Sequence, residues 1–378
     1  MTPAAKDAQL DFVRLSAEEP SSLYFEQFLR GGFSDWPACY QERFPGLCTW
    51  TGVSGLKHSM RQVVNAPDDW QVLLASRSLS LVQLASSCMF RICRNVLTTD
   101  LSWPTYEQAL ETQARRTGNR ITTVPLRDGI LYGGWTVDDV TGYLASRFAE
   151  HHCDGLFLPA VDHLGIRLPI RHIVQRIQEQ ENLRFCFIDA SQAFCQVPLG
   201  DCLEFADFIV AGSHKWMGAC LPTGIGLFGQ RRSREMIEHR LNLLGQTGRN
   251  EDPLLLFTEQ LDTGRLDAHS ETTNLSSIFA CAGAVSDQLA AQHRTPAVES
   301  PSVDQTLAQI PRPTAGWHPH QPSESFRSRI VLFESQMSEL KPASPEALRR
   351  TWLDSGCIVT AYPDGRVRVS VAPAMQHW

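Results

Sequence analysis

Short apolar runs alternate with helix-like segments through the middle of this chain, and this alternation limits its possible folds more than any other feature. Runs that favour buried strands occupy residues 71–75, 120–124, 155–159, 184–188 and 208–211. Apolar side chains at helical spacing lie at residues 78–96, 136–150 and 170–179. Because strands joined through a helix usually pair in parallel, the alternation predicts a mostly parallel sheet with helices on both faces. A Gly-rich apolar run at 224–229 is expected to return antiparallel.

Two polar residues follow neighbouring apolar runs. Asp189 comes directly after the run at 184–188, and Lys215 lies shortly after the run at 208–211. Taken alone, each would be a solvated turn or surface residue. Since parallel strands end at the same edge of a sheet, the two side chains are expected to share one crevice. Pyridoxal phosphate requires such a pair, because a carboxylate keeps its pyridine nitrogen protonated and a lysine holds it as a Schiff base.

Three motifs extend this pattern along the chain. They are Asp189-Ala-Ser-Gln192, Ser213-His-Lys-Trp216 and Pro222-Thr-Gly-Ile-Gly226. In this order and spacing they resemble the class V aminotransferase family, which includes cysteine desulfurases, kynureninases and isopenicillin N epimerase-like enzymes. The resemblance is specific from Val72 to Asn274. It implies a fold-type I enzyme that depends on pyridoxal phosphate, with a mostly parallel seven-stranded sheet in an α/β large domain and a smaller α+β C-terminal domain.

The length of the chain also favours two domains. Its 378 residues exceed what one hydrophobic core usually holds. We expect an N-terminal arm and linker at 1–45 that belongs with the small domain, a large cofactor-binding domain at 46–274 and a small domain at 275–378. In the small domain we expect strands at 326–333, 357–361 and 366–371, a helix at 345–355 and an irregular connection at 295–323.

The resemblance implies roles for residues at the strand ends. Lys215 would form the Schiff base and act as the catalytic proton shuttle, and Asp189 would bind the pyridine nitrogen. Gln192 matches the donor to the phenolic oxygen of the cofactor. Trp103 matches the residue that covers the pyridine face, although packing in the core is a competing explanation for this indole.

The cofactor phosphate is expected near two serine-containing turns. Ser78 and Ser80 follow the first strand, where helix N-terminal N–H groups bind anions, although Ser78 could simply cap a helix. Arg77 departs from the small residues that relatives place in this turn. Ser213 is a less certain substitute for a phosphate-binding serine of relatives, and His214 precedes the lysine as it does in many of them.

Three more residues complete the expected site. Thr272 matches a segment that reaches the phosphate of the neighbouring subunit, which implies a homodimer with shared active sites. Asp162 stands where desulfurase-like relatives often carry Asn and would add negative charge near the phenolic oxygen, and His163 could equally face the ring. Arg368 matches the arginine that binds the substrate α-carboxylate, but strand alternation places Arg366 on the same face.

Composition excludes several classes of partner. The net charge of −7 and the absence of a Lys/Arg-rich block argue against nucleic-acid binding. No apolar run reaches membrane-spanning length and the N-terminus lacks a signal-peptide core, so we expect a cytoplasmic enzyme with a small-molecule amino acid substrate and no membrane partner. The eleven cysteines contain no CxxC pair and are expected to be scattered buried thiols, with no metal site.

The motifs predict the cofactor but not the bond that breaks. Cα deprotonation to a quinonoid begins aminotransfer, elimination and epimerisation alike. We expect an aminotransferase or a C–S or C–C lyase. A cysteine desulfurase or selenocysteine lyase-like enzyme and an epimerase remain alternatives, as does an inactive binding protein that retains the fold. Cys357 lies in a turn without a group that would lower its pKa, which disfavours transfer of sulfur to a protein thiol.

Overall fold

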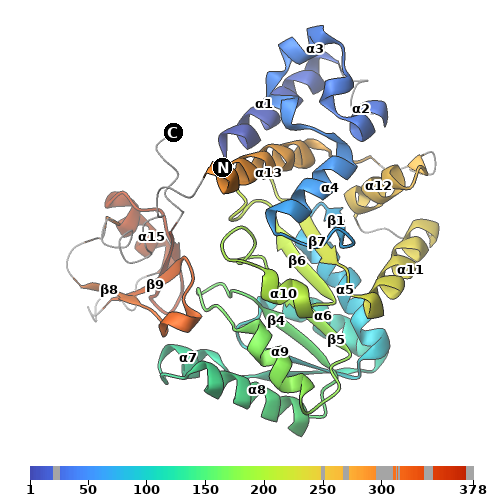
Figure 1. Cartoon of the computed structure of the whole chain (residues 1–378). Coiled ribbons are helices and arrows are strands. Elements are labelled where there is room, and N and C mark those ends of the chain that lie inside the picture. The colour runs from blue at the N-terminus through green and yellow to red at the C-terminus, as the bar shows by residue number, and fades with distance from the viewer. Residues whose placement is uncertain are drawn as a thin grey trace.

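A computed structural model describes residues 1–19, 26–247, 252–266, 272–294, 310–311, 313, 316–335 and 344–371. A seven-stranded sheet forms its centre, with strand order β1-β7-β6-β5-β4-β2-β3 (Figure 1). The strands are β1 (Gln71–Ala75), β2 (Asn95–Thr99), β3 (Arg120–Val124), β4 (Gly155–Pro159), β5 (Phe185–Asp189), β6 (Phe208–Gly212) and β7 (Gly224–Phe228).

Strand pairing agrees with the sequence-based prediction. The neighbours β2–β3, β2–β4, β4–β5 and β5–β6 are parallel, whereas β7 is antiparallel to both β6 and β1. The mostly parallel seven-stranded sheet is therefore confirmed, and so is the antiparallel return of the Gly-rich run. The carboxyl ends of six strands consequently lie along one edge.

Side chains alternate between the two faces of the sheet, as the pleat requires. In β5, Phe185 and Phe187 join one hydrophobic cluster, whereas Cys186 and Ile188 join the other. One face is covered by α5 (Ser78–Ile92), α6 (Pro104–Thr117) and α11 (Arg231–Thr247). On the other face lie α8 (Val137–Glu150), α9 (Ile170–Gln178) and α10 (Gly200–Phe205). Both faces are buried, which explains why the strands read as continuous apolar runs.

A second, antiparallel sheet forms a smaller unit beside α7 (Arg127–Leu131) (Figure 1). Its strand order is β10-β11-β9-β8, and the strands are β8 (Trp317–His320), β9 (Ile330–Ser335), β10 (Thr360–Ala361) and β11 (Val367–Ser370). Helix α15 (Pro345–Asp354) packs Trp352 against Phe333 and Trp317, with ring centroids 5.2 Å apart in both pairs. The predicted α+β character is confirmed, but β8 lies where we expected an irregular connection.

The main error in the sequence-based prediction concerns residues 93–99. We expected one helix over 78–96, but α5 ends at Ile92 and β2 begins at Asn95. Val96 falls four residues after Ile92, so the apolar spacing mimics another helical turn. In the sheet, β2 pairs on both sides, with β3 and β4, and these neighbours override the local pattern.

Several helices were not predicted from the sequence. Besides α6, α7, α10 and α11, they are α4 (Gly52–Val63) and α12 (Pro253–Asp262). The N-terminal region also contains α1 (Pro3–Glu18), α2 (Glu26–Gly31) and α3 (Ala38–Arg43), with 3-10 turns η2 (Phe33–Asp35) and η3 (Pro45–Thr49); a further turn, η5 (Glu324–Phe326), precedes β9.

The N-terminal region contributes to the main core rather than forming only an extended arm. Helix α1 packs along α13 (Ser276–Arg294), and the rings of Phe12 and Phe279 stack with centroids 4.4 Å apart. Phe12, Leu15 and Phe28 belong to the same hydrophobic cluster as one face of the large sheet. The domain boundaries at residues 45 and 274 stay a prediction.

Candidate active site

The carboxyl edge of the large sheet brings the two key residues together. Asp189 is the last residue of β5, and its neighbour across the ladder is Val210 of β6. After Gly212, the chain turns through residues 213–217, and Lys215 lies in this turn. The structure thus places the carboxylate and the amine at adjacent strand ends, as the parallel arrangement predicts.

Asp189 and Lys215 influence each other electrostatically. Burial raises the pKa of Asp189, and the positive charge of Lys215 opposes this shift. Loss of solvation lowers the pKa of Lys215 from its usual range, although the residue as a whole is exposed; the nearby charge of Arg368 lowers it further, and Asp189 acts in the opposite direction. An amine with a lowered pKa is a better nucleophile and base near neutral pH.

Gln192 is held in a defined orientation. Its Oε1 accepts a hydrogen bond of 2.9 Å from Nε1 of Trp216, one residue after the lysine. An indole N–H can only donate, so the amide oxygen must face Trp216 and the amide nitrogen faces elsewhere. The NH₂ group is then oriented as a donor, the role that the resemblance implies for this residue.

The turn between β1 and α5 is crowded on one side. A Cβ at Gly224 would lie 2.5 Å from the carbonyl carbon of Arg77 and 2.7 Å from the nitrogen of Ser78, so β7 requires glycine where this turn passes. Asp252 caps α12 and also accepts bonds from the N–H of Ser76 at 3.0 Å and from its hydroxyl at 3.1 Å. An anion at this turn would therefore rely on the N–H groups at the start of α5.

Tyr106 links this turn to the end of β5, a role that sequence reasoning missed. Its hydroxyl lies 2.6 Å from Oγ of Ser78 and 3.3 Å from Oγ of Ser191, and the N–H of Ser191 donates to Asp189 at 2.8 Å. Burial raises the pKa of Tyr106 to about 12, so the phenol stays protonated. The sequence offered one indication of this role. Tyr106 lies three residues after Trp103, on the buried face of α6, a helix that was not predicted.

The remaining serine, histidine and threonine positions differ in accessibility. Ser80 is buried in the first turn of α5. The Ser213 hydroxyl is also buried, donating to the Leu221 carbonyl at 3.1 Å and accepting from the Thr223 N–H at 2.9 Å. This geometry disfavours the expected phosphate contact of Ser213, because the hydroxyl already stabilises the lysine-bearing turn. His214 and Thr272 are exposed, and Thr272 lies outside regular secondary structure, shortly before α13.

Asp162 is built into a turn after β4. Its Oδ1 accepts hydrogen bonds from the N–H groups of Leu164 at 3.0 Å and Ile166 at 2.7 Å, whereas its Oδ2 is buried without a hydrogen-bond partner in the described part of the chain. Burial raises the pKa of Asp162 to about 7, and these backbone bonds oppose the shift. The full negative charge that the sequence suggested here is thus reduced at neutral pH.

The rings of Trp103 and His163 contact each other near the carboxyl edge of the large sheet. Their ring centroids are 5.5 Å apart in an edge-to-face arrangement, and the Trp103 residue is 47% exposed. This exposure argues against core packing as the explanation of Trp103. Tyr362, from the small unit, approaches His163 from another side, with centroids 6.0 Å apart, and its hydroxyl donates to the His163 carbonyl at 3.2 Å.

The structure distinguishes the two candidate arginines. Arg366 forms an ion pair with Asp364 through Nε and Nη2. Arg368 instead donates from Nη1 to the carbonyl of His163 at 3.1 Å, and its Nε is buried without a hydrogen-bond partner among the described residues. Of the two, Arg368 keeps its charge available to a substrate carboxylate.

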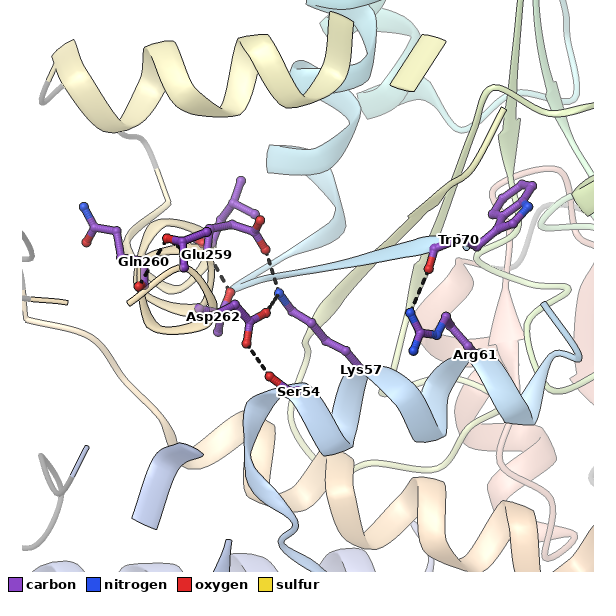
Figure 2. Close-up of polar contacts among 10 residues, drawn as sticks. Ser54, Lys57, Arg61, Trp70, Glu259, Gln260 and Asp262 are labelled. Carbon is purple, nitrogen blue, oxygen red and sulfur yellow. Dashed lines mark hydrogen bonds and ion pairs between the residues drawn. The ribbon is translucent and has the colours of Figure 1, made fainter. Parts of the chain in front are cut away.

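A separate pocket of about 480 Å³ lies at the opposite, amino edge of the sheet, where β1 begins. Figure 2 shows Lys57 of α4 pointing at Glu259 and Asp262 of α12, with Nζ 2.7 Å and 2.5 Å from their carboxylate oxygens. The charged residues that line this pocket are two basic ones, Lys57 and Arg265, and three acidic ones, Glu238, Glu259 and Asp262. Because the pocket lies at the edge of the sheet opposite Lys215, we assign it no part in the chemistry.

The cysteines are less uniformly buried than expected. All eleven are free thiols; six are buried, and Cys39 and Cys48 are exposed. Among the described residues, no group of three His, Cys, Asp or Glu side chains is arranged to hold a metal ion. Within the same residues, no helix is long and apolar enough to cross a bilayer.

Solved structures with this fold include enzymes of several activities. The cystine C-S lyase C-DES, in complex with cysteine persulfide, aligns with 100% of this chain and 91% of its own at 13% identity and a TM-score of 0.62. Also similar is ureidoglycine-glyoxylate aminotransferase from Bacillus subtilis, which covers 85% of this chain and 79% of its own at 12% identity and a TM-score of 0.61. DndA from Streptomyces lividans covers 98% of this chain and 96% of its own at 15% identity and a TM-score of 0.59. At these identities, the likeness shows the fold alone.

Sequence comparison identifies the family. A search of curated proteins finds no significant match. The family model described as aminotransferase class-V matches residues 49–285, which is more than half of the chain and includes every strand of the large sheet. This confirms the family that the three motifs predict, and pyridoxal phosphate is the cofactor on which that family depends. The chain belongs to the class V aminotransferases.

Proposed function

We propose that this protein is a pyridoxal phosphate-dependent enzyme that removes the Cα proton of an amino acid, with Lys215 as the cofactor-linked residue. The observation that carries the proposal is the placement of Asp189 and Lys215 at adjacent strand ends, where each shifts the pKa of the other. The available groups fit the cofactor: a buried carboxylate, an amine with a lowered pKa, an oriented amide donor at Gln192 and the N–H groups at the start of α5, where the N-cap residue Arg77 makes no side-chain capping bond.

Each residue has a defined task in this proposal. Pyridoxal phosphate supplies a ring that withdraws electrons from the substrate Cα. Asp189, in a low-dielectric site, stabilises a proton on the ring nitrogen. Lys215, with its lowered pKa, accepts and returns the proton at Cα. Arg368 binds the α-carboxylate, and Trp103 shields the site from water.

Aminotransfer and C–S bond cleavage both remain within this proposal, since relatives of this fold carry out each and both begin at Cα. Sulfur transfer to Cys357 is less well supported. That thiol is partly buried against the small core, and burial raises its pKa, so the reactive thiolate is disfavoured.

We also propose a homodimer in which Thr272 reaches the partner's cofactor phosphate. The exposure of Thr272 leaves it available to a second chain. Sedimentation equilibrium of the purified protein should give twice the chain mass, and a monomer that binds the cofactor with full activity would contradict the shared site.

The lysine assignment is tested by trapping. Protein incubated with pyridoxal phosphate should absorb as a lysine-linked cofactor, and borohydride reduction should leave a pyridoxyl group on Lys215, detectable by peptide mass spectrometry. Lys215→Ala should abolish the adduct, whereas the exposed control Lys6→Ala should retain it. A protein that takes up no cofactor, or an adduct on another lysine, would refute the proposal.

A further inference from the structure

Four buried polar atoms without hydrogen-bond partners belong to residues around His163, which Arg368 contacts directly and whose pKa Arg127 influences. Within the described residues they are Nε of Arg127, Oδ2 of Asp162, Nδ1 of His163 and Nε of Arg368. They come from the loops after β3 and β4 and from β11 of the small unit. A buried polar atom left unpaired costs about 1–3 kcal/mol, so such a cluster indicates a binding site for a polar ligand.

Positive charge dominates this cluster. After burial, the groups that lower the pKa of His163, to about 4, are Arg127, Arg368, Arg366 and Lys215. The imidazole is therefore neutral, and the charge of Arg366 is already balanced by Asp364. Two acidic residues lie near Arg127. Asp162 has a raised pKa that leaves it only partly charged at neutral pH, and the Asp100 carboxylate accepts from the backbone N–H groups of Leu126 and Arg127. Within the described residues, neither the Arg127 nor the Arg368 guanidinium forms an ion pair with a carboxylate.

Arg127 is held in place by Asp100, through its carboxylate and its backbone carbonyl. It begins α7, its backbone N–H donates to Oδ1 of Asp100 at 3.2 Å, and its Nη2 donates to the carbonyl oxygen of Asp100. None of the ion pairs in the described part of the chain includes Arg127. A guanidinium fixed by a carbonyl, with an unpartnered Nε, presents a planar fork that suits a carboxylate or another oxyanion.

We propose that the substrate is an amino acid with a second anionic group in its side chain, and that Arg127 binds this group while Arg368 binds the α-carboxylate. This inference rests on the proposed function, since it places a substrate beside Lys215. It names a specificity residue outside the three motifs. The anion could be a carboxylate or a sulfur oxyanion, because both accept two parallel hydrogen bonds from a guanidinium.

Binding of unreactive analogues to the cofactor-loaded enzyme tests this inference without turnover. Analogues with a methyl group at Cα cannot lose a proton there. α-Methylaspartate, α-methylglutamate and α-methylcysteate represent the acidic class, and α-methylnorvaline represents the neutral class. Dissociation constants come from the change in cofactor absorbance and from calorimetry. At least one acidic analogue should bind about tenfold or more tightly than α-methylnorvaline, and the preferred analogue distinguishes a carboxylate from a sulfonate.

Variants separate recognition from structural support. Arg127→Gln should remove the preference for acidic analogues and leave the affinity for α-methylnorvaline unchanged. Arg127→Lys should retain part of the preference for acidic analogues. Arg368→Gln should weaken the binding of every analogue. The control Arg176→Gln, on the exposed end of α9, should change nothing. Circular dichroism verifies that the Arg127 variants fold.

The outcomes distinguish this inference from the proposed function. Equal affinities in the wild type, or an equal loss for both classes in Arg127→Gln, would overturn the role of Arg127 while the lysine assignment stands. If the folded protein takes up no pyridoxal phosphate, both proposals fail.

Discussion

Asp162 illustrates, at the scale of one residue, how burial changes the chemistry that a side chain can offer. In an unfolded chain, an aspartate titrates near pH 3.9. Here burial raises the pKa of Asp162 to about 7. Between these values, the folded state holds a proton that the unfolded state has lost, so stability falls as the pH rises from about 4 to about 7 and then levels off.

The substitution Asp162→Asn should therefore stabilise the protein at pH 8 and have little effect at pH 4. The amide oxygen can still accept from Leu164 and Ile166, and no charge is buried. The expected gain at pH 8 is on the order of a few kcal/mol in the free energy of unfolding. Urea unfolding at both pH values measures it, with the exposed Asp68→Asn as control. An equal effect at both pH values would show that Asp162 is not protonated by burial.

Tyr106 matters at the scale of elements, because it joins the start of α5 to the loop after β5. Tyr106→Phe removes the hydroxyl between Ser78 and Ser191 and keeps the ring in the core. Cofactor affinity should fall by about tenfold, the equivalent of one to two hydrogen bonds, with secondary structure unchanged. Equilibrium titration with pyridoxal phosphate measures the effect, and Tyr143→Phe on α8 serves as the control. Unchanged affinity would limit Tyr106 to packing.

Lys57 of α4 forms ion pairs with two residues of α12, and Ser54 adds a hydrogen bond to Asp262 (Figure 2). Burial alone would lower the pKa of Lys57, but Glu259 and Asp262 outweigh it and raise that pKa, so below about pH 10 the lysine remains charged and the pairing stabilises the fold. Lys57→Met leaves two carboxylates close together and should lower the free energy of unfolding by about 2 kcal/mol or more. Adding Glu259→Gln and Asp262→Asn to this variant should recover most of the lost free energy of unfolding. Thermal unfolding compares the variants; a triple variant no better than the single one would contradict this account.

At the scale of the whole molecule, helix α1 covers part of the main hydrophobic core by packing on α13. Phe12 is buried against Phe279 of α13, whereas its neighbour Val13 is 54% exposed. Phe12→Ala should lower the free energy of unfolding by about 3–5 kcal/mol, and Val13→Ala by less than about 0.5 kcal/mol. Chemical denaturation provides the comparison. If both substitutions had the same small effect, α1 would be a dispensable arm.

The N-terminus also touches the catalytic turn. The N–H of Thr2 donates to the carbonyl oxygen of Gly218 at 2.9 Å, three residues after Lys215. A segment that the sequence indicates as an arm thereby supports the lysine-bearing turn, which is a relation between residues more than two hundred positions apart.

The sequence by itself determined the family, the strand that ends at Asp189, the strand that precedes Lys215, and the parallel core. Each depends on local order: a motif has a fixed spacing, and a strand buried on both faces shows as a continuous apolar run. Strand β2 and helix α6 were missed because neighbouring strands and the core select those conformations against an ambiguous local pattern.

Only the tertiary structure decided which side chains are available for chemistry. It paired Arg366 with Asp364 and, among the described residues, gave Arg368 no acidic partner. It also hydrogen-bonded the Ser213 hydroxyl within its own turn and brought Arg127 into the charged surroundings of His163. The physical reason is that pairing, burial and electrostatic fields depend on distances between segments far apart in the chain, which spacing along a sequence does not contain.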